Sequence, residues 1–253
     1  MFPYHDENKT LRTAVVTIGL VVTCVVVWLL VQGGGTEQAV AESVCNFGLI
    51  PGELLQTLRA GISIPMTERL VCVIDEGPEY RNLITSMFLH GGWMHLLGNM
   101  WFLWLFGNNI EDSMTRPRYL LFYLLCGLAA ALAQVFADQN SPIPMVGASG
   151  AISGVMGGYL VLFPRVKVFT FVPLGFVMTT LALPAWVMLL YWMGLQFLGT
   201  IGSSLNEGEG GVAFWAHIGG FVAGVVLVKL FARRDRLEAH QHAHWRPQQQ
   251  GFR

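Results

Sequence analysis

The sequence predicts an all-α polytopic membrane protein, folded as a bundle of six transmembrane helices. Of its 253 residues, 53% are hydrophobic and only 12% are charged, which is about half the charged fraction usual in soluble domains. The mean hydropathy is +0.51, and the net charge of −1 gives no general attraction to nucleic acid. We therefore expect the lipid bilayer as the protein's surroundings and no nucleic acid among its partners.

Six apolar segments are long enough to cross a hydrocarbon layer, which takes about 17–25 helical residues. They cover residues 13–31, 93–110, 119–136, 146–163, 184–201 and 212–231. The first segment is too long for a signal peptide and has no small-residue cleavage site, so we interpret it as an uncleaved anchor. The predicted organisation is a cytoplasmic N-terminus (1–12), a membrane domain (13–232) with a long outer loop (32–92), and a polar cytoplasmic tail (233–253) without regular structure.

The basic residues predict the orientation of the bundle. With a cytoplasmic N-terminus, every Lys and Arg except Arg59, Arg69 and Arg81 lies on the cytoplasmic side, as the positive-inside rule requires. We expect an integral, multi-pass protein of the bacterial inner membrane with both termini in the cytoplasm. The apolar stretch 168–183 contains a proline and a glycine and follows two basic residues, which favours a hairpin or broken helix at the cytoplasmic interface over a seventh span.

The outer loop and the tail leave alternatives open. Cys45 and Cys72 can form a disulfide in an oxidising outer compartment, and two unpaired thiols in a half-buried loop are the alternative. Apolar residues in 50–64 recur at near-helical spacing and predict an amphipathic helix on the outer leaflet. The alternating histidines of the tail indicate a solvated segment, with a metal site as the alternative; these are His240, His242 and His244. The cysteines have no metal-site spacing, and we expect neither a metal nor a cofactor.

Polar side chains within the spans are costly in lipid and are therefore candidates for function. His95 and Asn99 lie four residues apart, on one face of the helix over 93–110. Ser149 lies at the start of the fourth span and His217 near the start of the sixth. With six spans, the fourth and sixth both run inward, so these two residues reach the same outer depth. A seventh span would place them on opposite sides of the membrane.

Ser149 and His217 are a candidate nucleophile and general base, because a serine hydroxyl needs a proton acceptor to attack a carbonyl. The backbone N–H of Ser149, the Asn99 amide and the His95 ring are candidate donors to an oxyanion. Each residue taken singly also has a structural explanation, such as packing or helix bridging. Their occurrence at one depth on three helices favours the functional interpretation.

Glycines and aromatic residues lie near these polar groups. Gly147 and Gly150 leave space beside the serine. Further small residues on the fourth and sixth spans allow the two helices to approach closely. Trp186, Trp192 and Phe197 on the fifth span are interpreted as bulk that faces lipid or the interface.

Three motifs carry a resemblance to a known family: HGGWMHLLGNM, which begins at His90, GASG around Ser149, and AHIGGFVAG around His217. In this order they resemble the rhomboid intramembrane serine proteases over about residues 79–231. The resemblance implies a six-transmembrane-helix rhomboid-like bundle. It also implies a dyad of Ser149 and His217 without an acidic residue, with His95 and Asn99 in the oxyanion site.

The resemblance extends to Arg81, similar to the arginine of a tryptophan–arginine pair in the outer loop, and to Glu111, similar to a glutamate that closes the second helix. Two positions depart from the family pattern. Tyr80 stands in place of the tryptophan, and Ser153 stands where some members have a tyrosine stacked on the base histidine. His217 therefore needs another neighbour to hold its ring.

The expected function is that of a serine endopeptidase that cleaves transmembrane segments of other membrane proteins near their outer ends. Its partners are then transmembrane protein substrates and the lipid bilayer. The alternative is a catalytically inactive rhomboid-like protein that binds membrane proteins or acts in their quality control. The presence of both the serine and the histidine favours the protease.

Overall fold

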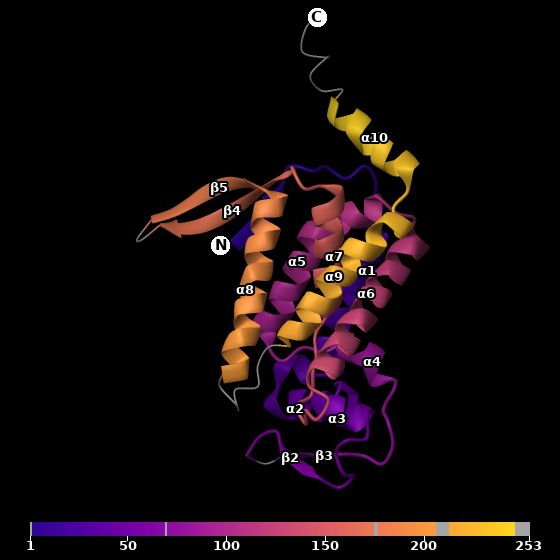
Figure 1. The fold of residues 1–253 in the computed structure, drawn as a ribbon, viewed down its shortest axis with the longest axis vertical. Coiled ribbons are helices and arrows are strands. Elements are labelled where there is room, and N and C mark those ends of the chain that lie inside the picture. Colours follow the sequence, from indigo (N-terminus) through magenta and orange to yellow (C-terminus); the bar gives the residue numbers. More distant parts are fainter. Residues whose placement is uncertain (1, 69, 175–176, 206–212, 246–253) are drawn as a thin grey trace, which may run out of the picture.

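The computed structural model describes residues 2–68, 70–174, 177–205 and 213–245, with side chains in these ranges except at 173–178, 200–205 and 240–245. Each of the six predicted spans contains a long helix, and these helices pack side by side (Figure 1). They are α1 (Val15–Leu30), α5 (Trp93–Asp112), α6 (Arg116–Ala137), α7 (Ser149–Leu162), α8 (Ala185–Leu205) and α9 (Phe214–Phe231). The main hydrophobic core lies between them.

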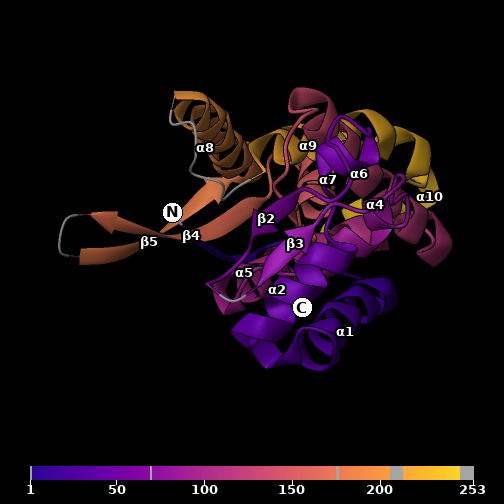
Figure 2. The ribbon, with the colours of Figure 1, turned by 90° about the horizontal axis from the view of Figure 1, so that it is seen from below.

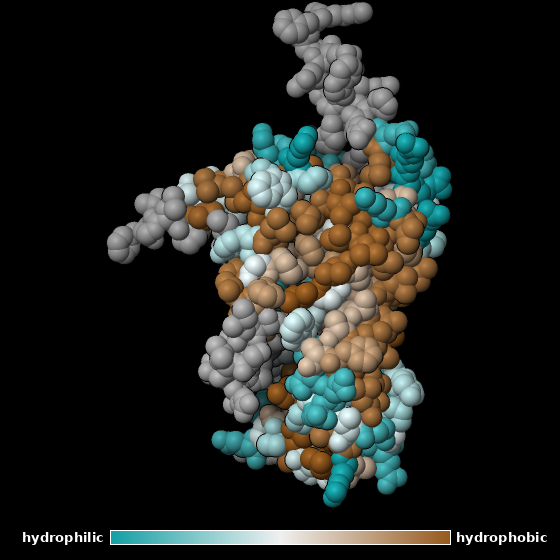
Figure 3. All heavy atoms as spheres, viewed as in Figure 1, coloured by the Kyte–Doolittle hydropathy of each residue, from teal (hydrophilic) through white to brown (hydrophobic). Residues whose placement is uncertain are grey.

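The surface of the bundle has the pattern of a membrane protein. Helices α6 and α9 are long and apolar enough to cross a bilayer, and α1, α7 and the first part of α8 are shorter apolar helices. Large apolar side chains are exposed along the bundle, with Leu30 at 80% and Leu230 at 72%. Figure 3 shows apolar residues over the middle of the visible face and hydrophilic residues toward both ends.

The fold is mostly helical, as expected, but it is not purely α, because two small antiparallel sheets lie at opposite ends of the bundle (Figure 1). One sheet has the strand order β1-β4-β5 and the other pairs β2 with β3. The remaining elements are β1 (Phe2–Asp6), η1 (Gly33–Gly35), α2 (Glu37–Phe47), α3 (Pro51–Leu54), β2 (Ser63–Pro65), β3 (Val71–Val73), α4 (Asn82–Thr85), η2 (Ser86–Phe88), β4 (Lys167–Leu174), β5 (Val177–Pro184) and α10 (Arg234–Trp245).

The stretch 168–183 is a β-hairpin, which confirms the hairpin interpretation. Strands β4 and β5 pair from Lys167 opposite Pro184 to Leu174 opposite Val177, and Figure 2 shows the hairpin extending away from the helices. β-branched and aromatic residues favour a strand here. The N-terminal strand β1 pairs with β4, which the sequence did not suggest.

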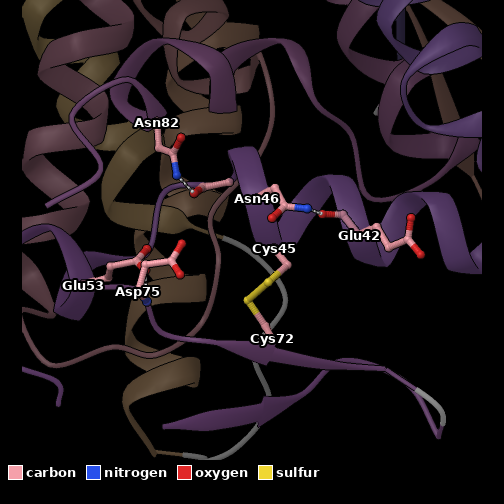
Figure 4. Close-up of a disulfide and its surroundings, with 8 residues drawn as sticks. Glu42, Cys45, Asn46, Glu53, Cys72, Asp75 and Asn82 are labelled. Carbon is pink, nitrogen blue, oxygen red and sulfur yellow. Dashed lines mark hydrogen bonds between the residues drawn. A yellow bond between two sulfur atoms is a disulfide. The ribbon is translucent and has the colours of Figure 1, made fainter. Parts of the chain in front are cut away.

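In the long segment between α1 and α5, Cys45 of α2 and Cys72 of β3 form a disulfide (Figure 4). The amphipathic helix predicted over 50–64 is wrong, because α3 ends at Leu54 and Gln56 has a φ of 57°. Leu54 packs against α6, and Leu58 packs beside the disulfide. These leucines are therefore used to attach the loop to the protein, and they do not form a continuous face toward lipid.

The tail does not lack regular structure, since α10 covers Arg234–Trp245. The Arg236 guanidinium donates a hydrogen bond to the Met114 carbonyl between α5 and α6. Arg234 lies within 3.8 Å of Glu238 one turn later, a spacing that supports a helix. The contact of Arg236 with Met114 attaches the start of α10 to the bundle.

The glycines of α7 and α9 bring the backbones of these two helices into contact. A Cβ atom added at Gly224 would collide with the Gly154 carbonyl, one added at Gly220 with the Gly150 carbonyl, and one added at Gly157 with the Phe221 carbonyl. Small residues allow this approach between helices in lipid. Because the two helices also carry Ser149 and His217, their close contact determines the geometry of the site.

We expect Gly224→Ala to destabilise the protein by about 1–3 kcal/mol, the usual cost of overpacking. Gly19→Ala on α1 is the matched control, since nothing lies within 4 Å of a Cβ at that position. It should be neutral or slightly stabilising, because alanine is the better helix former. Thermal unfolding in detergent measures both variants. Equal melting temperatures for Gly224→Ala and the wild type would contradict the backbone contact.

At the other end of the bundle, Asp6 joins strand β1 to two helices. Its Oδ2 accepts hydrogen bonds from Tyr159 Oη at 2.6 Å and from Asn109 Nδ2 at 2.9 Å. Burial raises the pKa of Asp6 from 3.8 to about 6, and the hydrogen bond from Tyr159 offsets only part of this rise. The native state therefore favours the protonated carboxyl more strongly than the unfolded chain does.

The resulting stabilisation is fully present below about pH 4 and is lost as the pH rises through about 6. We expect the loss of this stabilisation to lower the melting temperature of the wild type in detergent as the pH rises from about 4 to about 7. Asp6→Asn should remove it, because an amide does not titrate. The same pH dependence in wild type and variant would show that Asp6 is not its source.

Candidate active site

Ser149 is the first residue of α7, and the chain reaches it through Gly147, whose φ is 126°. This left-handed conformation favours glycine. The Gly147 amide donates to the Ser86 carbonyl at 2.9 Å, which holds the turn in place. A Cβ atom at Gly147 would lie 2.7 Å from His95 Nε2 and 3.6 Å from Ser149 Oγ. Gly147 therefore keeps the space between the serine and His95 free of side chain.

The structure places Ser149 Oγ 2.8 Å from His217 Nε2, across the contact between α7 and α9. His217 lies in the first turn of α9. Gly150, the residue after the serine, packs against α6, where a Cβ would come within 2.6 Å of Ala130 Cβ. The serine and the histidine are thus within hydrogen-bond distance, each near the N-terminal end of its helix.

The other nitrogen of His217, Nδ1, lies 2.7 Å from Oε1 of Gln196 on α8. Trp192, one turn earlier on α8, has its ring centroid 5.7 Å from that of His217. Sequence reasoning missed Gln196, although an amide within an apolar span was a signal of function. The interpretation of Trp192 as lipid-facing bulk is wrong, because its ring packs beside the histidine, whereas Trp186 and Phe197 are about half exposed.

His95 and Asn99 lie one turn apart on α5. His95 Nδ1 accepts a hydrogen bond from the Gly91 amide at 3.2 Å, so a neutral ring carries its proton on Nε2, the atom that faces Gly147. Asn99 is 7% exposed, and its Nδ2 has no hydrogen-bond partner among the described residues. A buried amide donor without a partner is unusual in a folded protein. Both side chains can therefore donate to an added group.

His90 supports His95 from the segment before α5. The two rings meet edge to face, with centroids 5.2 Å apart. The His90 backbone is held by Gln32 at the end of α1, which donates to the His90 carbonyl and accepts from its amide, both at 2.8 Å. His90 thus helps to position the neighbouring ring and does not itself touch the serine or His217 in the contacts described.

A small cavity of about 20 Å³ lies beside Ser149. Most of its lining residues are small, and they come from η2, α6, the turn before α7, α7 and α9. They include Gly127, Ala130, Ala131, Gly147, Ala151 and Ala216. The space is large enough for about one water-sized or methyl-sized group.

Other predicted residues lie elsewhere. The Arg81 side chain lies just before α4 and is 59% exposed; it pairs with Glu79 at 2.6 Å and lies over the ring of Phe47. It is not brought into the site. Tyr80 beside it is 68% exposed. Ser153 is buried and donates to the Ser149 carbonyl at 2.6 Å, and it makes no contact with the His217 ring among the contacts described.

Glu111 lies at the far end of α5 and holds the first turn of α1. Its carboxylate accepts from the Val16 amide at 2.9 Å and from the Thr17 amide at 2.7 Å, which are helix N-terminal donors without a partner inside the helix. Among the described residues, no group of three His, Cys, Asp or Glu side chains is arranged to hold a metal ion. The side chains of the alternating tail histidines lie outside the described part of the chain.

Comparisons with known proteins agree with the three motifs. The family model described as "Rhomboid domain" matches residues 77–234. Relatives include "RHOMBOID-like protein 5" of Arabidopsis thaliana, 33% identical over 42% of this chain and 35% of its own length. "Rhomboid protein 1, mitochondrial" of Saccharomyces cerevisiae is 30% identical over 57% of this chain and 40% of its own. "Rhomboid protease GluP" of Bacillus subtilis is 41% identical over 32% of this chain and 16% of its own.

The chain spans about two fifths or less of the length of these relatives. Their sources include a plant, a yeast mitochondrial protein and a bacterium. They therefore do not support the bacterial inner membrane over other membranes as the location of this protein.

Proposed function

Because the chain belongs to the rhomboid family of integral membrane proteins, we propose that it is a serine endopeptidase that cleaves transmembrane segments of other membrane proteins near their outer ends. One observation carries the proposal: Ser149 Oγ lies 2.8 Å from His217 Nε2. A serine and an imidazole at this distance are suited to nucleophilic attack with general-base assistance. The name of one relative, "Rhomboid protease GluP", agrees with this activity.

We place all six long helices across the membrane, with both termini in the cytoplasm. The apolar middle of the visible surface supports this arrangement (Figure 3). The basic residues near the ends of α6, α7 and α9 support the orientation. Since α7 and α9 both begin at the Ser149 end of the bundle, the site then lies toward the outer side of the membrane.

In the proposed reaction, Ser149 Oγ attacks the carbonyl carbon of the scissile peptide while its proton passes to His217 Nε2. The carbonyl oxygen becomes an oxyanion, which accepts hydrogen bonds from the Ser149 amide, His95 Nε2 and Asn99 Nδ2. His217 then gives the proton to the leaving amine as the C–N bond breaks. Water, activated by the same histidine, attacks the acyl-enzyme, and the serine leaves with its proton restored.

The cavity beside Ser149 predicts a preference for small side chains next to the scissile bond. Its volume of about 20 Å³ accommodates a methyl group and excludes an aromatic ring. In a set of single-span substrates that differ only at the residues flanking the cleaved bond, we expect alanine or glycine on one side to support cleavage. Phenylalanine at that position should reduce kcat/KM by at least about tenfold. Equal rates would contradict the assignment of this cavity.

The experiment that tests the function uses protein reconstituted in vesicles with a single-span model substrate. We expect two product fragments whose new ends map near the outer end of the substrate's transmembrane segment. A fluorophosphonate probe should label the protein, and peptide mass spectrometry should locate the label on Ser149. Ser153→Ala is the matched control and should retain both results. A wild-type protein that neither cleaves such substrates nor reacts with the probe would favour the inactive, membrane-protein-binding alternative.

A further inference from the structure

The position of Gln196 raises a question about how the base histidine is held. Ser153 of α7 does not hold the His217 ring in the contacts described, because its hydroxyl bonds to the backbone of its own helix. The ring is instead bonded on both nitrogens, to Ser149 on one side and to Gln196 on the other. We propose that Gln196 is a positioning residue that selects the tautomer of His217 competent to act as a base. This inference rests on the proposed function.

The chemistry of the amide explains the selection. With Gln196 Oε1 facing Nδ1, the ring donates its proton to the amide oxygen at 2.7 Å. The lone pair is then on Nε2 and faces the Ser149 hydroxyl, as deprotonation of a serine requires. The opposite tautomer would direct an N–H at the serine and leave no acceptor for its proton. Gln196 thus does with a neutral amide what a carboxylate does in other serine hydrolases.

The surroundings of Gln196 support a specific role. An amide in an apolar helix is costly at membrane depth unless it bonds to another group. The adjacent Leu195 and Phe197 are 46% and 55% exposed, whereas Gln196 is turned toward His217. Trp192, one turn away on the same helix, packs beside the ring and limits its rotation. One face of α8 therefore supplies both contacts that fix the histidine.

The test compares Gln196→Met with Leu195→Met, the same replacement at neighbouring positions. In vesicles with the single-span substrate, Gln196→Met should reduce kcat by about 10- to 100-fold with little change in KM, as expected when a buried hydrogen bond to the base is lost. Gln196→Glu should recover most of the rate, since its carboxyl oxygen can accept from Nδ1 in either protonation state. Leu195→Met should cleave like the wild type. Wild-type rates in Gln196→Met, with Ser149→Ala inactive, would overturn this inference and leave the proposed function intact.

A second measurement does not depend on activity. Nitrogen-15 NMR of labelled histidine, assigned by comparison with His217→Ala, reports which ring nitrogen carries the proton. We expect the proton on Nδ1 in the wild type and a mixture of tautomers in Gln196→Met. The same tautomer in both proteins would overturn the proposal, even if no substrate were found. Melting temperatures of the two methionine variants show whether each has folded.

Discussion

Replacing Ser149 or His217 with alanine is expected to reduce cleavage to background, a loss of at least about 10³-fold in kcat. Either change removes a reacting group, so no step of the proposed reaction proceeds at its normal rate. The two losses should not add in the double variant, because the serine and the histidine act as a unit. The measurement is the single-turnover rate of substrate cleavage in vesicles.

Ser153→Ala is the matched control for the serine. It makes the same replacement one turn later on α7, where the hydroxyl bonds to the Ser149 carbonyl. We expect its rate to stay within a few-fold of the wild type. Cleavage that survives Ser149→Ala would show that another residue is the nucleophile.

Asn99→Ala is expected to reduce activity without reducing the stability of the protein. If the amide donates to the oxyanion, its loss should reduce kcat by about 10²–10³-fold, the usual effect of removing one such donor. Stability should stay the same or rise, because Nδ2 is a buried donor that no described residue satisfies. Rates and melting temperatures are measured on the same preparations.

Asn109→Ala, a change of the same kind on the same helix, should show the opposite pattern. Asn109 Nδ2 donates to Asp6 at the other end of α5. Its removal should destabilise the protein by about 1–3 kcal/mol in free energy of unfolding, which lowers the melting temperature, and leave kcat unchanged for the folded fraction. An Asn99→Ala variant that unfolds more easily while retaining activity would assign Asn99 to structure.

The sequence predicted all six long helices, because an apolar run of about 20 residues has few alternatives in lipid. The sequence also predicted Ser149 and His217 at one depth, since the number of spans determines which helix ends lie on the same side of the membrane. The 2.8 Å approach in the structure is compatible with that expectation. The glycines near both residues gave the signal for close helix packing.

The elements that the sequence did not reveal depend on long-range pairing. Strand β1 forms only because β4 is available beside it, and the two are separated by most of the chain. The leucines of 50–64 have a helical spacing, but burial against α6 and the disulfide overrides it. Gln196 was missed because a single amide on the fifth span has no neighbouring motif, and its partner lies 21 residues later on α9.

The backbone contact between α7 and α9 has a consequence for how a long peptide gains access to the serine. If α7 and α9 moved apart, the hydrogen-bond distance between the Ser149 hydroxyl and the His217 ring would be lost. Access by movement of a neighbouring helix, such as α8, would leave that pair untouched but carry Gln196 away from His217. A displaced α8 and an aligned imidazole would then exclude one another, and hydrolysis would begin only after α8 had returned to its place beside the bound peptide.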